Sequence, residues 1–337
     1  PLGTVYKIEA YLKAFGGFFT DLLPLAEVAA WGLIMLELLL GVCMLLNVRT
    51  QWTSWISLLF YSVMMPLTLY IALTNPVSDC GCFGDAIVLT NWQTFWKNVV
   101  LIILAIILIA LRKSVRELWQ TWMEGVIAAV TIILVVAFML WTKNHLPLKD
   151  FRPYKIGNHI PTLMEYPENA EPDQYEITLV YEQNGVEQAF TIENYPKGDS
   201  TWTYVRTDSK LIKKGYEPPI HDLEIINAEG EDLTWDILES EESVTLVVMY
   251  DLEKANRKQI NKVEALYETC LNNWQQYYIL TGSGTDEIIS FSLAYPSLSE
   301  CICTCDPVTL KTIVRANPGV IVVQNGVVID KYNIKNR

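Results

Sequence analysis

The sequence lacks the signatures of the common enzyme classes. It contains no phosphate loop, no nucleotide-binding fingerprint and no Ser/His/Asp arrangement with supporting context. Only three of its 337 residues are histidines and only seven are cysteines. It also has no internal repeat and no low-complexity segment, which excludes repeat architectures. The function has to be sought in the few cysteines and in the distribution of charge.

Positive charge is scarce, and its distribution divides the chain. The net charge is −13, but residues 1–150 hold nine acidic and nine basic side chains, whereas residues 151–337 hold 29 acidic and 16 basic ones. Nucleic acid is not an expected partner, because phosphate binding requires a basic surface. A neutral apolar half followed by an acidic half predicts a membrane domain joined to a soluble one.

Four apolar segments are long enough to cross a hydrocarbon core of about 30 Å. They comprise residues 25–46, 52–73, 95–111 and 122–141, and tryptophans cluster at their ends as in an interfacial belt. The sequence therefore predicts a multi-pass α-helical membrane bundle and the lipid bilayer as a partner.

The loop charges orient this bundle. Arg49 and the basic segment 112–116 fall on one side, which the positive-inside rule makes cytoplasmic. Residues 74–94 contain no Lys or Arg and fall on the opposite side, together with everything after Trp141. This orientation also places residues 1–24 outside, and the chain begins without Met or a signal peptide. We therefore expect a further span upstream.

The second half is β-rich at first and then alternates strands and helices. Asn184-Gly185 predicts a hairpin, a second is expected near Glu229-Gly230, and a final one at Asn325-Gly326. From residue 243 the segments SVTLVVMY, QYYILTG and ECICTCD read as strands between helices. We expect a transmembrane domain at 1–145, an extracytoplasmic linker with β-hairpin at 146–215, and an α/β domain with a mixed sheet at 216–337.

Cys80 and Cys82 stand one residue apart in DCGCFGD, on the side expected to be oxidising. A disulfide between them closes a small strained ring that is readily reduced. Closing so short a loop stabilises the fold little, which favours a redox pair over a staple. Structural or free thiols in a tight turn are one alternative. A metal site is another, although it needs more ligands than two thiols.

Glu37 lies near the middle of its span, where burying a charged acid is costly. Two roles stay open for it. It is either an intramembrane proton carrier for quinone-coupled oxidation or a hydrogen-bonding partner of Tyr61, Ser62 or Tyr70.

Cys301, Cys303 and Cys305 alternate along a strand-length segment, so an extended strand would place all three on one face. They are secondary candidates for a redox site, or for a disulfide with Cys270. A three-thiolate metal site and simple apolar packing are the alternatives.

Two resemblances follow from specific motifs. PLGTVYKIEAYLKAF, ELLLGV and SDCGCFGDAIVLTNWQTFWKNVVL resemble the DoxX/MauE family of bacterial integral membrane proteins. Membership implies a multi-pass protein of the bacterial cytoplasmic (inner) membrane, a first span upstream of PLG, and a role in disulfide formation and maturation of periplasmic redox enzymes. The match covers residues 1–145.

The segments YEPPIHDLEIINAEGEDLTWDI and RANPGVIVVQNGVVI resemble a thioredoxin-like domain over residues 216–337, which implies a cis-proline at Pro318. The Cys-x-x-Cys pair of that family is absent, since the chain reads DLEKANRKQ there. Cys305 would then lie near the missing pair and the cis-proline.

These observations predict a membrane thiol–disulfide protein, a possible disulfide oxidoreductase. Cys80 and Cys82 would exchange electrons with a periplasmic client or redox protein and pass them to a membrane quinone. The alternative is a non-catalytic membrane scaffold whose degenerate thioredoxin-like domain binds a partner.

Overall fold

The structure is a computed structural model, and it describes residues 2–77, 84, 86–111, 118–213 and 215–336. The helical half contains α1 (Leu2–Phe15), the 3₁₀ helix η1 (Gly17–Leu25), α2 (Ala26–Leu45), α3 (Thr50–Thr74), α4 (Asn91–Leu111) and α5 (Thr121–Asn144). Four helical segments of the described chain are long and apolar enough to cross a membrane, the first formed by η1 and α2 together. The predicted spans are therefore confirmed, with shifts of a few residues at their ends.

Ion pairs connect α5 to α2 at one end of the bundle and to the start of α3 at the other. At one end Lys143 Nζ lies 2.6 Å from Glu27 Oε1, and at the other Arg49 Nε lies 3.1 Å from Glu124 Oε2. Glu124 is only 6 % exposed, so removing Arg49 would leave a buried carboxylate without its ion-pair partner. The two pairs hold the ends of α5 against the start of α2 and the start of α3.

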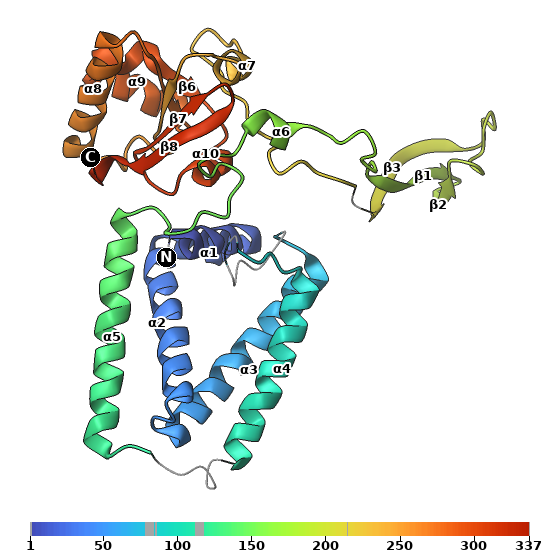
Figure 1. The fold of residues 1–337 in the computed structure, drawn as a ribbon. Coiled ribbons are helices and arrows are strands. Elements are labelled where there is room, and N and C mark those ends of the chain that lie inside the picture. The colour runs from blue at the N-terminus through green and yellow to red at the C-terminus, as the bar shows by residue number, and fades with distance from the viewer. Residues whose placement is uncertain (1, 78–83, 85, 112–117, 214, 337) are drawn as a thin grey trace.

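Helix α1 lies across one end of the bundle, between the spanning helices and the C-terminal domain (Figure 1). Val5 packs against Ala26 and Ala30 at the start of α2. On the domain side, the Tyr6 hydroxyl donates to the Tyr250 hydroxyl at 3.2 Å. The sequence did not predict this helix, because its apolar side needs the spanning helices to pack against.

After α5 the chain passes the short helix α6 (Ile160–Met164) and forms an arm that projects from the body (Figure 1). The arm is an antiparallel sheet of order β2-β1-β3, built from β1 (Gln174–Gln183), β2 (Val186–Thr191) and β3 (Thr203–Lys213). The predicted hairpin is confirmed, with Asn184 and Gly185 at φ 55° and 82°, as a two-residue turn requires. Strand β3 was not predicted.

A five-stranded sheet of order β6-β5-β4-β7-β8 forms the centre of the C-terminal domain. Its strands are β4 (Val244–Val248), β5 (Gln276–Thr281), β6 (Ile302–Thr304), β7 (Gly319–Gln324) and β8 (Val327–Asn333). β4, β5 and β6 run parallel, whereas β7 and β8 run antiparallel to their neighbours. The mixed sheet and the closing hairpin at Asn325-Gly326 are confirmed. The second expected hairpin is reduced to a turn with one bridge, Ile226 to Asp232.

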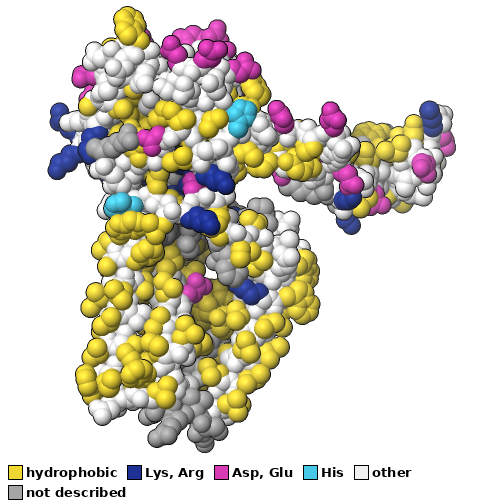
Figure 2. Space-filling view, in the orientation of Figure 1, with side chains coloured by type: hydrophobic (Ala, Val, Ile, Leu, Met, Phe, Trp, Pro, Cys, Tyr) yellow, Lys and Arg dark blue, Asp and Glu magenta, His cyan; other side chains and the backbone are white. Residues whose placement is uncertain are grey.

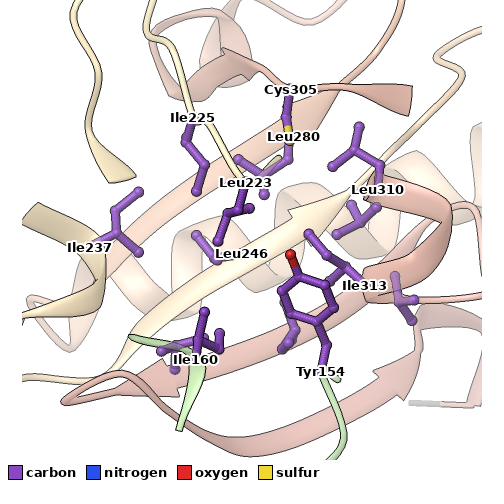
Figure 3. Packing of buried hydrophobic residues seen from close by; sticks show 14 of the residues in the cluster. Tyr154, Ile160, Leu223, Ile225, Ile237, Leu246, Leu280, Cys305, Leu310 and Ile313 are labelled. Atoms are coloured by element: carbon purple, nitrogen blue, oxygen red, sulfur yellow. The ribbon is translucent and has the colours of Figure 1, made fainter. Parts of the chain in front are cut away.

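Helices cover both faces of this sheet. One face packs against α8 (Arg257–Asn272) and α9 (Thr285–Ala294), and the other against α7 (Thr234–Leu238) and α10 (Pro307–Ile313), as in Figures 1 and 3. Two 3₁₀ helices, η2 (Pro296–Cys301) and η3 (Ile334–Asn336), complete the domain. Every residue of β4 is buried, which explains its continuous apolar sequence. Asp306 followed by Pro307 is a sequence typical of a helix start, and α10 begins there with the Asp306 carboxylate accepting from the Val308 and Thr309 amides.

A buried ion triad attaches the domain to the segment that leaves α5. Asp150 accepts from Arg152 Nε at 2.9 Å and from Lys331 Nζ at 2.7 Å. Arg152 also donates to the Thr312 carbonyl in α10, and Lys331 to the Tyr154 carbonyl. Burial raises the pKa of Asp150, but the two cations outweigh it and hold that pKa below its usual value. Burial and the nearby Arg152 lower the pKa of Lys331 to about 8.

This triad predicts a pH dependence of stability in the alkaline range. The pKa of Lys331 is about 8 in the folded protein and about 10.4 in an unfolded chain. Between these values the unfolded state binds more protons, so the free energy of unfolding should rise with pH. We expect the melting temperature of the wild type to rise relative to that of Lys331→Met across this window. Parallel pH curves for the two proteins would contradict this assignment, and the exposed Lys210→Met serves as control.

Candidate functional site

The loop that carries Cys80 and Cys82 lies outside the described residues, but both of its ends are described. The Asn91 side-chain amide at the start of α4 donates to Asn75 Oδ1 at 2.6 Å and to the Val77 carbonyl at 2.7 Å. Thr90 and Gln93 cap α4 reciprocally, each amide donating to the other side chain. The two ends of the loop are therefore held together.

These loop ends lie at the same end of the bundle as α1 and the C-terminal domain (Figure 1). The geometry follows from chain direction, because α4 and α5 together cross the bundle twice between the loop and the domain. The described ends of the loop and the domain thus lie at the same end of the bundle.

A polar strip on α4 leads from the loop into the bundle. Asn91, Thr94 and Asn98 are all buried, and the Asn98 side-chain amide donates to Thr68 Oγ1 of α3 at 3.2 Å. Asn91 Oδ1 and Thr94 Oγ1 have no hydrogen-bond partner among the described residues. Buried polar atoms are usually satisfied, so this strip is unusual for a membrane helix.

Glu37 has its own polar neighbours on the same helices. This residue of α2 lies near enough to interact electrostatically with Tyr61 of α3 and Lys97 of α4. Tyr61 was among the expected partners. Within the described chain, Glu37 forms no hydrogen bond with Ser62 or Tyr70, and Tyr70 packs edge-on against Phe15. Lys97 was missed, although a lysine within an apolar run is itself a signal for an intramembrane partner.

The cysteines of the C-terminal domain do not share a face. Cys301 ends the 3₁₀ helix η2 and packs against the core cluster beneath α8, whereas Cys303 and Cys305 lie in the cluster on the opposite side of the sheet. Figure 3 shows Cys305 among apolar side chains. The expectation of one shared face was wrong, because only Ile302–Thr304 is extended.

These cysteines form neither a disulfide nor a metal site in the described structure. The expected disulfide with Cys270 is not present, and Cys43, Cys270, Cys301, Cys303 and Cys305 are all free thiols. Nor do the described residues include a group of three or more side chains able to hold a metal ion. The disulfide and three-thiolate interpretations of this cluster are therefore not supported.

Burial makes these thiols poor nucleophiles. It raises the pKa of Cys305 to about 12 and those of Cys301 and Cys303 to about 11. Burial also raises the pKa of Cys270. Because the thiolate is the reactive species, these groups are almost entirely unreactive at neutral pH.

The end of the sheet nearest α1, where β4 ends and β7 begins, contains polar groups but no pair of cysteines among the described residues. Asn317 Nδ2 donates to the Asp251 carbonyl at 2.6 Å, joining the loop after β4 to the start of β7, and the Asn317–Pro318 peptide bond is cis. Cys305 follows β6, three strand spacings or about 14 Å from β7. It is therefore not part of one compact site with Pro318.

Comparison with known proteins supports the membrane half of this description. Residues 5–111 match the family described as methylamine utilisation protein MauE. Residues 175–214, in the arm, match a domain of unknown function, DUF8463. No curated protein and no solved structure matches the chain. The chain is therefore a multi-pass membrane protein whose helices α1 to α4 are similar to the MauE family.

Proposed function

We propose that this protein is a membrane thiol–disulfide redox protein that exchanges electrons through Cys80 and Cys82. The observation that carries this proposal is a contrast between two sets of cysteines. The described residues that flank Cys80 and Cys82, Val77 and Asn91, are hydrogen-bonded to each other at the end of the bundle that faces the C-terminal domain. The cysteines of the domain are buried and have raised pKa values.

The site would act on the extracytoplasmic face of the bacterial cytoplasmic membrane, where it supports the maturation of exported proteins. A client dithiol gives two electrons and two protons to the Cys80–Cys82 disulfide, so that the client is oxidised and the pair reduced. A membrane quinone then takes the same electrons and protons and becomes a quinol. Glu37, beside Tyr61 and Lys97, would carry protons along this path.

The C-terminal domain would hold the client. Its sheet order, with parallel β4 and β5 followed by antiparallel β7 and β8, supports a thioredoxin-like core. Helix α8 begins after Asn256 with a capping box and no cysteine in its first turns. We therefore assign the C-terminal domain a binding role. The chain would then be divided into a transmembrane domain at 1–145, a linker region at 146–215 and this binding domain at 216–337.

Trapping a mixed disulfide tests the proposal. In membranes that contain the full chain, Cys82→Ser should accumulate a reducible adduct with its client through Cys80, and Cys80→Ser an adduct through Cys82. The double variant Cys80→Ser, Cys82→Ser should give no adduct. The buried-thiol control Cys43→Ser should behave as the wild type. If Cys80 and Cys82 react fully with maleimide without reductant, and client disulfides are unchanged in Cys80→Ser, the redox function is wrong.

A non-catalytic scaffold is the second candidate, favoured by the absence of a dithiol near α8. In that case the domain and its arm would bind a partner, and the loop would only shape a turn. The scaffold function predicts that a Cys80→Ser, Cys82→Ser variant retains full activity in cells. Loss of activity in that variant, with partner binding intact, would exclude it.

A further inference from the structure

A pocket of about 360 Å³ lies where the spanning helices, α1 and the C-terminal domain meet. Its floor includes Tyr6 of α1, and its walls include Tyr250 after β4 and Asn333 at the end of β8. Four lysines line it: Lys143, Lys254, Lys311 and Lys335. Only two carboxylates do so, Glu9 and Glu27. The pocket is therefore cationic.

Two of the four lysines are already neutralised. Lys143 pairs with Glu27 at 2.6 Å, and Lys254 pairs with Asp251 at 2.8 Å. Neither Lys311 nor Lys335 is within ion-pair distance of a carboxylate in the part of the chain that the structure describes. Glu9 is the one lining carboxylate that remains for these two lysines, so the pocket keeps an excess of positive charge.

Lys311 is held in place by aromatic rings. Its ammonium lies 4.9 Å from the centre of the Tyr6 ring and 5.4 Å from that of Tyr250. The charged groups near it are of both signs, with Glu9 and Asp251 opposed by Lys13 and Lys254. Burial lowers the pKa of Lys311, so an anion in the pocket would stabilise its charged form.

The charge of this pocket contrasts with that of the domain above it. Residues 151–337 hold 29 acidic side chains against 16 basic ones. Figure 2 shows acidic side chains gathered on the side of the domain away from the helices, and basic ones along the junction. The domain thus presents positive charge where it meets the bundle.

The pocket lies at the depth of lipid headgroups. Lys143 is in the last turn of α5 and Glu27 in the first turn of α2, so both mark the end of the apolar spans. Basic side chains just outside a spanning helix are attracted to anionic lipids. A phosphate group is the anion that a membrane offers at this depth.

We propose that this pocket binds the phosphate group of an anionic membrane lipid, with Lys311 and Lys335 as its principal ligands. The bound lipid joins α1, the ends of the spans and the domain, and it fixes their arrangement. The proposal does not depend on the chemistry of Cys80 and Cys82.

Lipid-dependent stability of the full chain tests this site. The purified protein is placed in phosphatidylcholine nanodiscs with increasing fractions of phosphatidylglycerol, and its unfolding temperature is followed by tryptophan fluorescence. Phosphatidylglycerol should raise this temperature in the wild type. In the double variant Lys311→Gln, Lys335→Gln the apparent affinity for phosphatidylglycerol should fall about 30-fold. This estimate takes about fivefold, or slightly more, for each lysine near an anionic surface.

Two matched variants separate the site from general surface charge. Lys149→Gln removes a lysine that also lies over an aromatic ring near the membrane, 5.0 Å from the centre of Phe151, but outside the pocket. It should keep the wild-type response, and so should Lys311→Arg, which retains the charge. Equal losses in Lys149→Gln and in the double variant would overturn the proposal.

Inorganic phosphate distinguishes the two sources of the ligand. Added to the protein in a neutral detergent, it should stabilise the wild type far less than phosphatidylglycerol does. Strong stabilisation by inorganic phosphate, with none by phosphatidylglycerol, would overturn the lipid assignment and identify a soluble phosphate compound as the ligand.

Discussion

Asp150→Asn is expected to destabilise the C-terminal domain by about 3–5 kcal/mol, because it removes the only anion of a buried triad. The side chains of Arg152 and Lys331 are just 3 % and 2 % exposed, and both contact the Asp150 carboxylate. An amide cannot balance two positive charges in so dry a site. The loss should appear as a lower denaturant midpoint and as faster proteolysis between α5 and the domain.

The exposed pair of Arg206 and Glu187 in the arm provides the control. These side chains approach to 2.8 Å but are about half exposed, so Glu187→Gln should leave the stability nearly unchanged. Adding Lys331→Met to Asp150→Asn should recover part of the loss, because it removes one unpaired cation. If Asp150→Asn costs no more than Glu187→Gln, the triad does not attach the domain as described.

Lys97→Met is expected to lower both the stability and the thiol turnover of the membrane half. It leaves Glu37 without the lysine that interacts with it in the bundle, and an intramembrane acid without a partner is costly. Glu37→Gln should also lower stability, because it leaves Lys97 without its acid, and it should reduce turnover about 100-fold or more, which is the usual contribution of a proton-transferring group.

The double variant Glu37→Gln, Lys97→Met separates the two roles of Glu37. It should regain stability lost in Lys97→Met, since neither charge of the Glu37–Lys97 pair is left without its partner, but it should stay as inactive as Glu37→Gln. Recovery of turnover in the double variant would show that Glu37 serves only to pair with Lys97. Tyr61→Phe, which removes a hydroxyl near Glu37, should have a smaller effect than either single charge variant. Turnover is measured as the rate at which Cys80 and Cys82 re-oxidise after reduction.

The elements that could be predicted from the sequence are those that obey local rules. The apolar spans, the turns at Asn184-Gly185 and Asn325-Gly326 and the Asp306 cap depend on neighbouring residues alone, and the structure reproduces each of them. Local rules failed at ECICTCD, where the spacing of the cysteines by two residues predicted that all three lie on one face of a β-strand. There the 3₁₀ helix η2 takes Cys301 out of the strand and turns it towards the opposite core.

The sequence by itself determined that this is a membrane protein with an acidic α/β domain, and that this domain lacks a Cys-x-x-Cys pair. Only the tertiary structure decided which polar side chains meet. Asp150 and Lys331 are 181 residues apart in the chain, and Tyr6 and Tyr250 are 244 apart. Such pairs leave no periodic trace, because their partners are set by how the helices and the sheet pack. The unreactive state of the domain's cysteines has the same origin, since burial in that packed core raises their pKa values.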